Sequence, residues 1–189
     1  MKRRAVMRGL LAAVICGGVT LCAADETNSA AKSASASEAA QDDDLSAEEQ
    51  EVLDAANAER AKSKLAALKS SSALMKVARA HATNMAKQKV LVHTLDEKSF
   101  SKRIDEAGYT FWSAGENIAL GQKTGKEAVA DWMTSPGHKA NILSKDYTEI
   151  GIGRAVSKDG ETYWVQVFAR PQTEKPPVKV EKPAATTAK

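Results

Sequence analysis

The sequence predicts a mixed α+β domain in which helices cover a β-sheet. Two runs rich in β-branched and aromatic residues, EIGIGRAV and TYWVQVFA, are joined by SKDGE, whose Asp-Gly pair favours a hairpin turn. The short run NIAL at residues 117–120 is a candidate third strand. Segments with helical spacing precede and follow that run, and this order of elements is typical of a layered α+β domain.

Caps and apolar stripes indicate the first three helices. Ser46 and Glu49 form a capping-box signature at the start of the first. The second begins near residue 71 or 72 and carries one apolar stripe, which consists of Leu74, Val77, Ala78, His81 and Met85. Ser99 is placed to cap a short third helix that Gly108 ends.

Two further helices follow the candidate strand. Thr124 and Glu127 form a second capping box ahead of Val129, Trp132 and Met133. In the segment TSPGHKANIL, Pro136 suits the first turn of a short helix, and Ser135 is predicted to cap it. We expect this segment to be a helix-to-helix junction.

The first 24 residues have the composition of a secretory signal peptide. A basic start precedes an apolar run from residue 10 to 21 and small residues at 23 and 24, and the run is shorter than the roughly 18 residues of a membrane-spanning helix. Cleavage is the favoured interpretation, and an uncleaved anchor the alternative. Cys22 leaves open a lipoprotein, although Leu21 stands where a small residue is usual. Both cysteines lie in this segment, so no internal disulfide is expected in the mature domain.

Composition sets the remaining boundaries. Residues 25–45, rich in Ala, Ser, Asp and Glu, are predicted to be a disordered tether, and residues 172–189, rich in Pro and Lys, a disordered tail. The domain is expected at 46–171. Removal of the basic leader changes the formal charge from +3 to −1, so the sequence offers no argument for nucleic-acid binding, and no transmembrane span is expected in the mature protein.

The chain has three histidines, and every metal or catalytic hypothesis must draw on them. His81 lies on an apolar helical stripe, which favours a structural role. His93 lies in a loop, and His138 lies in the first turn of a short helix, where the helix dipole favours the neutral imidazole that can bind metal. Glu116, between Gly115 and Asn117, points into a cleft, pairs with a basic group or organises a turn.

The sequence resembles the CAP superfamily (cysteine-rich secretory proteins, antigen 5 and pathogenesis-related 1), whose domain is also called SCP. The motifs that carry the resemblance, in order over residues 52–169, are LDAANAERAKSKLAAL, ALMKVARAHATNMAKQ, VHT, RIDEAGY, GENIALG, WMTSPGHKANIL, EIGIG and YWVQVFA. GENIA and SPGHKANIL are most similar to the bacterial branch. The resemblance implies a three-layer α-β-α sandwich with a central cleft.

By the same resemblance, His93, Glu116 and His138 are cleft residues with Asn117 beside them, and His93 and His138 are the metal ligands if zinc is the cofactor. Many eukaryotic members have a second glutamate where Ser135 stands here, so the set of four is incomplete unless Glu149 or Asp131 replaces it.

Three functions remain open. The favoured one is an exported binding module, in the periplasm, secreted or at the cell surface, whose cleft takes a metal ion, a lipid, an envelope polymer or a protein. The second is a zinc-assisted hydrolase of peptide or envelope polymer, with Glu116 as general base. The third, a nucleophilic Ser135 beside His138, is disfavoured because Ser135 is explained as a helix cap. Residues 52–172 carry 18 basic and 13 acidic residues, a surplus that would favour anionic envelope polymers.

Overall fold

A computed structural model describes residues 44–174, and the predicted leader, most of the tether and the end of the tail lie outside this range. In chain order the elements are α2 (Ala47–Lys62), β1 (Lys69–Ser70), α3 (Ser72–Gln88), α4 (Phe100–Glu106), β2 (Phe111–Leu120), α5 (Gly125–Thr134), α6 (Pro136–Ile142), β3 (Glu149–Val156) and β4 (Thr162–Pro171). The predicted α+β class is confirmed.

The four strands form one sheet in the order β1-β3-β4-β2. β3 and β4 form the predicted antiparallel hairpin, β2 pairs antiparallel with β4, and the short β1 pairs parallel with β3. β2 is therefore an edge strand. It is also longer than the NIAL run, because the residues from Phe111 to Glu116 pair with β4 as far as Pro171.

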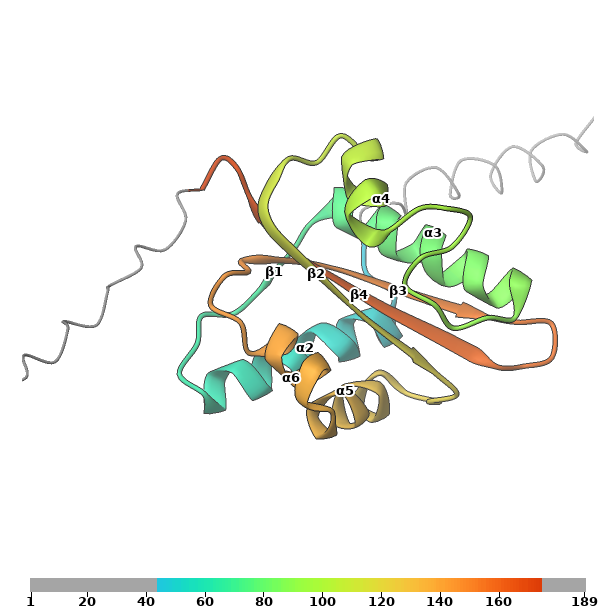
Figure 1. Ribbon diagram of the computed structural model, residues 1–189. Coiled ribbons are helices and arrows are strands. Elements are labelled where there is room, and N and C mark those ends of the chain that lie inside the picture. Colours follow the sequence, from blue (N-terminus) through green and yellow to red (C-terminus); the bar gives the residue numbers. More distant parts are fainter. Residues whose placement is uncertain (1–43, 175–189) are drawn as a thin grey trace, which may run out of the picture. The chain divides into compact units, whose positions relative to one another are not determined.

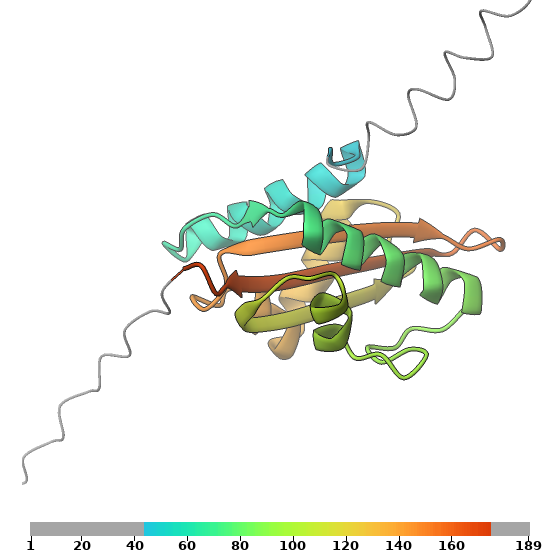
Figure 2. The ribbon, with the colours of Figure 1, turned by 90° about the horizontal axis from the view of Figure 1, so that it is seen from above.

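Helices cover both faces of the sheet, which gives the three layers. In Figure 1, α3 and α4 lie above the sheet and α2, α5 and α6 below it, and Figure 2 shows the same layers from above. Each interface has its own core. The core on the α3 side includes Leu74, Ile104, Val165 and Val167, and the opposite one is built around Val52, Trp132, Trp164 and Phe168.

The first turns confirm most of the predicted caps. In α2, Ser46 Oγ accepts from the amide of Glu49, and the Glu49 carboxylate accepts from the amide of Ser46 at 2.8 Å. Thr124 caps α5 in the same way, although the Glu127 carboxylate accepts from the amide of Lys123 instead of that of Thr124.

The prediction that Ser135 caps α6 is confirmed for its position but not for a side-chain hydrogen bond. Ser135 occupies the N-cap position, but its side chain makes no capping hydrogen bond. The residue is shared by two helices: its amide donates to Trp132 O at the end of α5, and its carbonyl accepts from the amide of Lys139 in α6. Backbone hydrogen bonds of Ser135 therefore complete the last turn of α5 and the first turn of α6. Pro136, at the first position of α6, has no amide that needs a partner.

Two glycines of β3 allow the backbone of α3 to lie directly on the sheet. A Cβ atom at Gly151 would be 2.1 Å from the carbonyl carbon of Leu74, and one at Gly153 would be 2.3 Å from that of Ala78. Since real Cβ contacts are never so short, side chains at these positions would push α3 away. The EIGIG motif thus fixes the position of the helix that carries His81.

Candidate functional site

The site is built around Glu116 on the edge strand β2. Neighbouring residues Ile118, Val165 and Val167 pack in the core on the α3 side, and side chains alternate between faces along a strand, so Glu116 also points toward α3 and α4. Its side chain is completely buried. A buried carboxylate requires charged or hydrogen-bonding partners, and two neighbouring elements provide them.

Arg103 of α4 supplies the charge partner. Its Nη2 donates to Glu116 Oε2 at 2.5 Å, and its Nη1 donates to the carbonyls of His93, at 3.0 Å, and Lys98, at 2.7 Å. The guanidinium therefore fixes both the carboxylate and the loop between α3 and α4. Sequence reasoning assigned Arg103 no role. Its only signal is the RIDEAGY motif, and nothing in the spacing shows that α4 faces Glu116.

His93 lies in that loop and is the second partner of Glu116. Its Nδ1 lies 2.9 Å from Glu116 Oε1, and about half of its side chain is exposed. A carboxylate paired with a guanidinium is an acceptor, so Nδ1 carries the hydrogen in the neutral ring. The other ring nitrogen, Nε2, is then the unprotonated one, and it has the lone pair that a metal ion or a ligand donor requires.

His81 completes the surroundings of the carboxylate, but it is buried. Its Nε2 bonds the carbonyl of Val92 at 3.0 Å and lies 3.9 Å from Glu116 Oε1. Burial lowers the pKa of His81, against the opposing attraction of Glu116. The neutral ring is a donor that holds the loop one residue before His93, which agrees with the predicted structural role.

His138 approaches from the other layer. It is partly exposed on α6, and its carbonyl accepts from the side-chain amide of Asn117 at 3.1 Å. Asn117 is fully buried and also bonds Gln166 and Asn141, so it holds α6 against the sheet. Burial lowers the pKa of His138, and the neighbouring His93 lowers it further. His93 and His138 thus approach the β2 edge from opposite layers, and the charge on one affects the other.

Side chains from the α5–α6 layer donate hydrogen bonds to backbone carbonyls at the free edge of β2. Asn141 donates to Glu116 O, Tyr147 to Ala114 O and Trp132 to Ile118 O, at distances of 3.0 to 3.2 Å. These bonds protect the edge against pairing with another strand. They also account for the glycine of the GEN motif, because a Cβ atom at residue 115 would lie 2.5 Å from the Tyr147 hydroxyl.

Neither candidate for a fourth, acidic member bonds the other site residues. Glu149 accepts from the Tyr109 hydroxyl at 2.7 Å, and Asp131 accepts from the Gln122 side chain at 2.8 Å. Ser135 lies at the junction of α5 and α6, as the motif implies.

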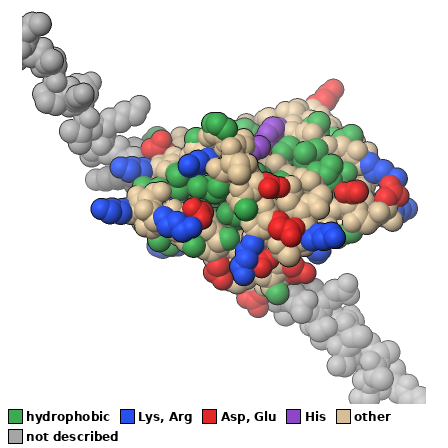
Figure 3. Space-filling view, turned by 90° about the horizontal axis from the view of Figure 1, so that it is seen from below, with side chains coloured by type: hydrophobic (Ala, Val, Ile, Leu, Met, Phe, Trp, Pro, Cys, Tyr) green, Lys and Arg blue, Asp and Glu red, His purple; other side chains and the backbone are tan. Residues whose placement is uncertain are grey.

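Few side chains of the site are placed to bind a metal ion. Among residues 44–174, no group of three or more His, Cys, Asp or Glu side chains is placed to hold a metal ion. The Glu116 carboxylate is buried and hydrogen-bonded to Arg103 and His93, whereas His93 and His138 are both partly exposed. Figure 3 shows histidine at the surface of the lower face, among hydrophobic side chains. No helix in the described range is long and apolar enough to cross a membrane.

Comparison with known proteins agrees with the fold and the motifs. Residues 53–168 match the model of the CAP family, described as the cysteine-rich secretory protein family. Uncharacterized protein YkwD of Bacillus subtilis is 38% identical over 127 residues, which are 66% of this chain and 48% of that protein. The chain thus spans about half the length of this relative.

Solved structures show the same architecture. An outer surface protein of Borrelia burgdorferi has a TM-score of 0.64 at 25% identity, over 68% of this chain and 96% of that one. An extracellular protein of Bacillus anthracis that contains an SCP domain has a TM-score of 0.59 at 27% identity, over 65% of this chain and 40% of that one.

Proposed function

Because the chain belongs to the cysteine-rich secretory protein (CAP) family, we propose that it is an exported binding module whose binding centre is the imidazole pair of His93 and His138. The relatives named above as extracellular and outer surface proteins support export, as does the leader composition. The bound molecule is a metal ion, a lipid, an envelope polymer or a protein segment.

One observation carries the proposal: the hydrogen bond from His93 Nδ1 to the buried Glu116 carboxylate. This bond fixes the ring orientation and directs the lone pair of Nε2 away from the core, as do carboxylates that accept a hydrogen bond from the other ring nitrogen of a metal-binding histidine.

Zinc is the metal that suits this pair best. Two neutral imidazoles are good zinc donors but fall short of the three protein ligands of typical catalytic sites. Zinc held by His93 and His138 would take its remaining ligands from water or from the bound molecule. We therefore expect weak zinc binding that depends on both histidines.

The hydrolase alternative is less well supported. A general base must reach the proton it removes, whereas the Glu116 side chain is completely buried and is held by Arg103 and His93. These contacts favour a positioning role for Glu116.

Zinc calorimetry tests the proposal on the wild type, His93→Ala and His138→Ala, with Lys139→Ala on the same helix as the matched control. Heat of binding in the wild type and Lys139→Ala, lost in both histidine variants, is the expected result. Equal binding in all four proteins would refute the imidazole pair. Turnover of casein or peptidoglycan that disappears in a correctly folded Glu116→Gln variant would favour the hydrolase instead.

A further inference from the structure

Exposed apolar side chains gather at the hairpin end of the domain, where the β3–β4 turn lies. Five large hydrophobic side chains are well exposed among residues 44–174: Leu91, Val92, Trp112, Leu120 and Val156. Leu91 follows the end of α3, Leu120 ends β2 and Val156 ends β3, whereas Val92 lies in the returning loop, where its carbonyl bonds His81. Scattered single residues of this kind are normal, but a group at one end is a reason to look for a partner.

These three elements all end at the same end of the molecule. β2 and β3 are both antiparallel to β4 and so run in one direction. α3 runs along β3 in that direction as well, since Gly151 contacts Leu74 and Gly153 contacts Ala78. Figure 1 shows the ends of α3, β2 and β3 on its right-hand side. Trp112 lies near the start of β2, at the opposite end.

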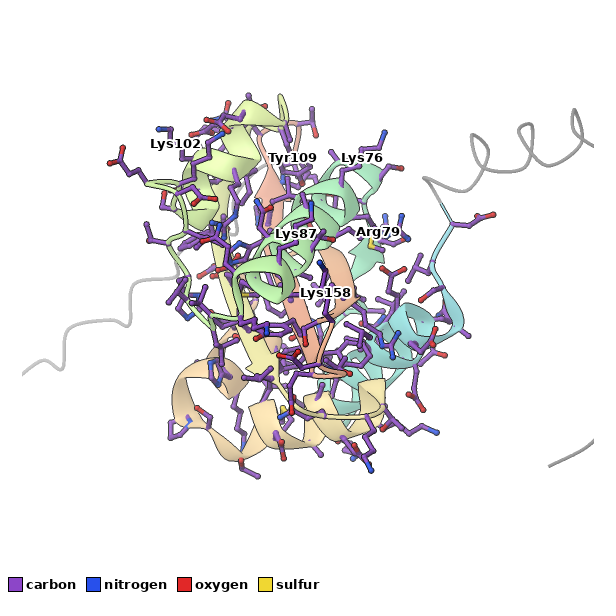
Figure 4. The ribbon with its side chains drawn as sticks, turned by 90° about the vertical axis from the view of Figure 1, so that its right-hand side faces the viewer. Lys76, Arg79, Lys87, Lys102, Tyr109 and Lys158 are labelled. Atoms are coloured by element: carbon purple, nitrogen blue, oxygen red, sulfur yellow. The ribbon has the colours of Figure 1, made fainter. Side chains whose placement is uncertain are left out.

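Lysines lie beside Val156 on the α3 side of this end. A hollow of about 700 Å³ lies between the end of α3 and the hairpin turn, with apolar lining from Ala86, Ala155 and Val156 and with three lysines, Lys87, Lys89 and Lys158. Figure 4 looks onto this end and shows Lys87 and Lys158 close to the hairpin. The hairpin end thus combines positive charge with exposed apolar surface.

Two of these lysines lack an acidic partner within the domain. Lys89 lies 2.5 Å from Asp159, which neutralises it. Lys87 and Lys158 form no ion pair with any residue in the described range, whereas Lys62, Lys98 and Lys126 pair with nearby carboxylates. Their charges are therefore available to an external anion.

We propose that the hairpin end binds an anionic lipid surface. Lysines near such a surface are attracted to its anionic headgroups. Burial of apolar side chains in the interfacial region is also favourable, because it removes apolar surface from water. A soluble polyanion would use only the lysines and would leave Leu91, Leu120 and Val156 in water. The apolar residues therefore favour a membrane over a soluble polymer. The inference is independent of the imidazole pair, and zinc binding does not test it.

Vesicle co-sedimentation tests the inference with the chain from Asp25 onward, which contains all of the described residues 44–174. Vesicles of phosphatidylglycerol and phosphatidylcholine are compared with vesicles of phosphatidylcholine alone, at low and high salt. We expect binding to the anionic vesicles only, and weaker binding at high salt. Each of Lys87→Gln and Lys158→Gln should weaken it roughly fivefold, and Val156→Ser should weaken it severalfold.

Lys69→Gln and Trp112→Ser are the matched controls, because both residues lie at the opposite end. Unchanged binding in these two variants is expected. Equal loss in the controls, equal binding to both kinds of vesicle, or a Val156→Ser variant that binds as well as the wild type would each overturn the inference. In the last case, equal binding to soluble dextran sulfate would identify a polyanion site.

Discussion

The guanidinium of Arg103 and the carboxylate of Glu116 meet at 2.5 Å across the interface between α4 and β2. The same guanidinium holds the carbonyl of His93, so one ion pair positions both the residue that orients the imidazole and the loop that carries it. The packing of α4 against β2 therefore determines the positions of Glu116 and His93.

Arg103→Met should therefore destabilise the domain by about 3 kcal/mol, because it leaves the Glu116 carboxylate buried without its charge partner. Glu116→Gln should cost a similar amount, and the double variant should cost clearly less than the sum. Urea unfolding of the four proteins measures this coupling. The exposed pair Lys98–Glu106 is the control, and Lys98→Met should cost less than about 1 kcal/mol. Additive effects of Arg103→Met and Glu116→Gln would contradict the pairing.

Stability should fall as the pH decreases from about 7.5 to 5.5, before most carboxylates titrate. Burial lowers the pKa of His81 below its ordinary value of 6.5. In this window the unfolded chain thus binds a proton that the folded chain does not, and the free energy of unfolding decreases by up to about 1.4 kcal/mol per pH unit for one histidine. His138 contributes in the same direction.

The variant His81→Gln isolates the first contribution, since it keeps a donor for the carbonyl of Val92 but does not titrate. Urea midpoints measured across the pH range should depend less steeply on pH in this variant than in the wild type. An identical pH dependence would show that His81 is not held neutral by the fold.

Much of the site could be predicted from the sequence, because motifs and caps are local. GEN and SPGH located Glu116 and His138, and the apolar stripe identified His81 as buried. The role of Arg103 could not be predicted, since its partner Glu116 is on the sheet and the contact depends on how α4 packs against β2. Arg60 was missed for the same reason: it continues the helical spacing of α2, yet it is buried and donates to the carbonyls of Ile142 and Ser144.

Gly153→Ala should be strongly destabilising, because the added Cβ would lie 2.3 Å from the backbone of Ala78. Overpacking of this kind typically costs about 1–3 kcal/mol, and a rigid backbone neighbour places the expected loss at the upper end. Gly137→Ala is the control, since no atom lies within 4 Å of its added Cβ; it should be neutral or slightly stabilising in α6. Thermal unfolding of both variants compares them, and equal melting temperatures would exclude the close contact between α3 and β3.

Asn117→Asp should destabilise the domain and also weaken any ligand binding that depends on His138. The side-chain amide of Asn117 donates to His138 O and to Gln166 Oε1, both at 3.1 Å. A carboxylate there would place an acceptor against two acceptors in a fully buried position, which costs more than about 2 kcal/mol. Asn84→Asp, on the exposed face of α3, should change stability by less than about 0.5 kcal/mol. Urea unfolding gives both values, and ¹⁵N chemical shifts of His138 report whether α6 moves. A stable Asn117→Asp variant with unchanged His138 shifts would show that Asn117 does not hold α6 in place.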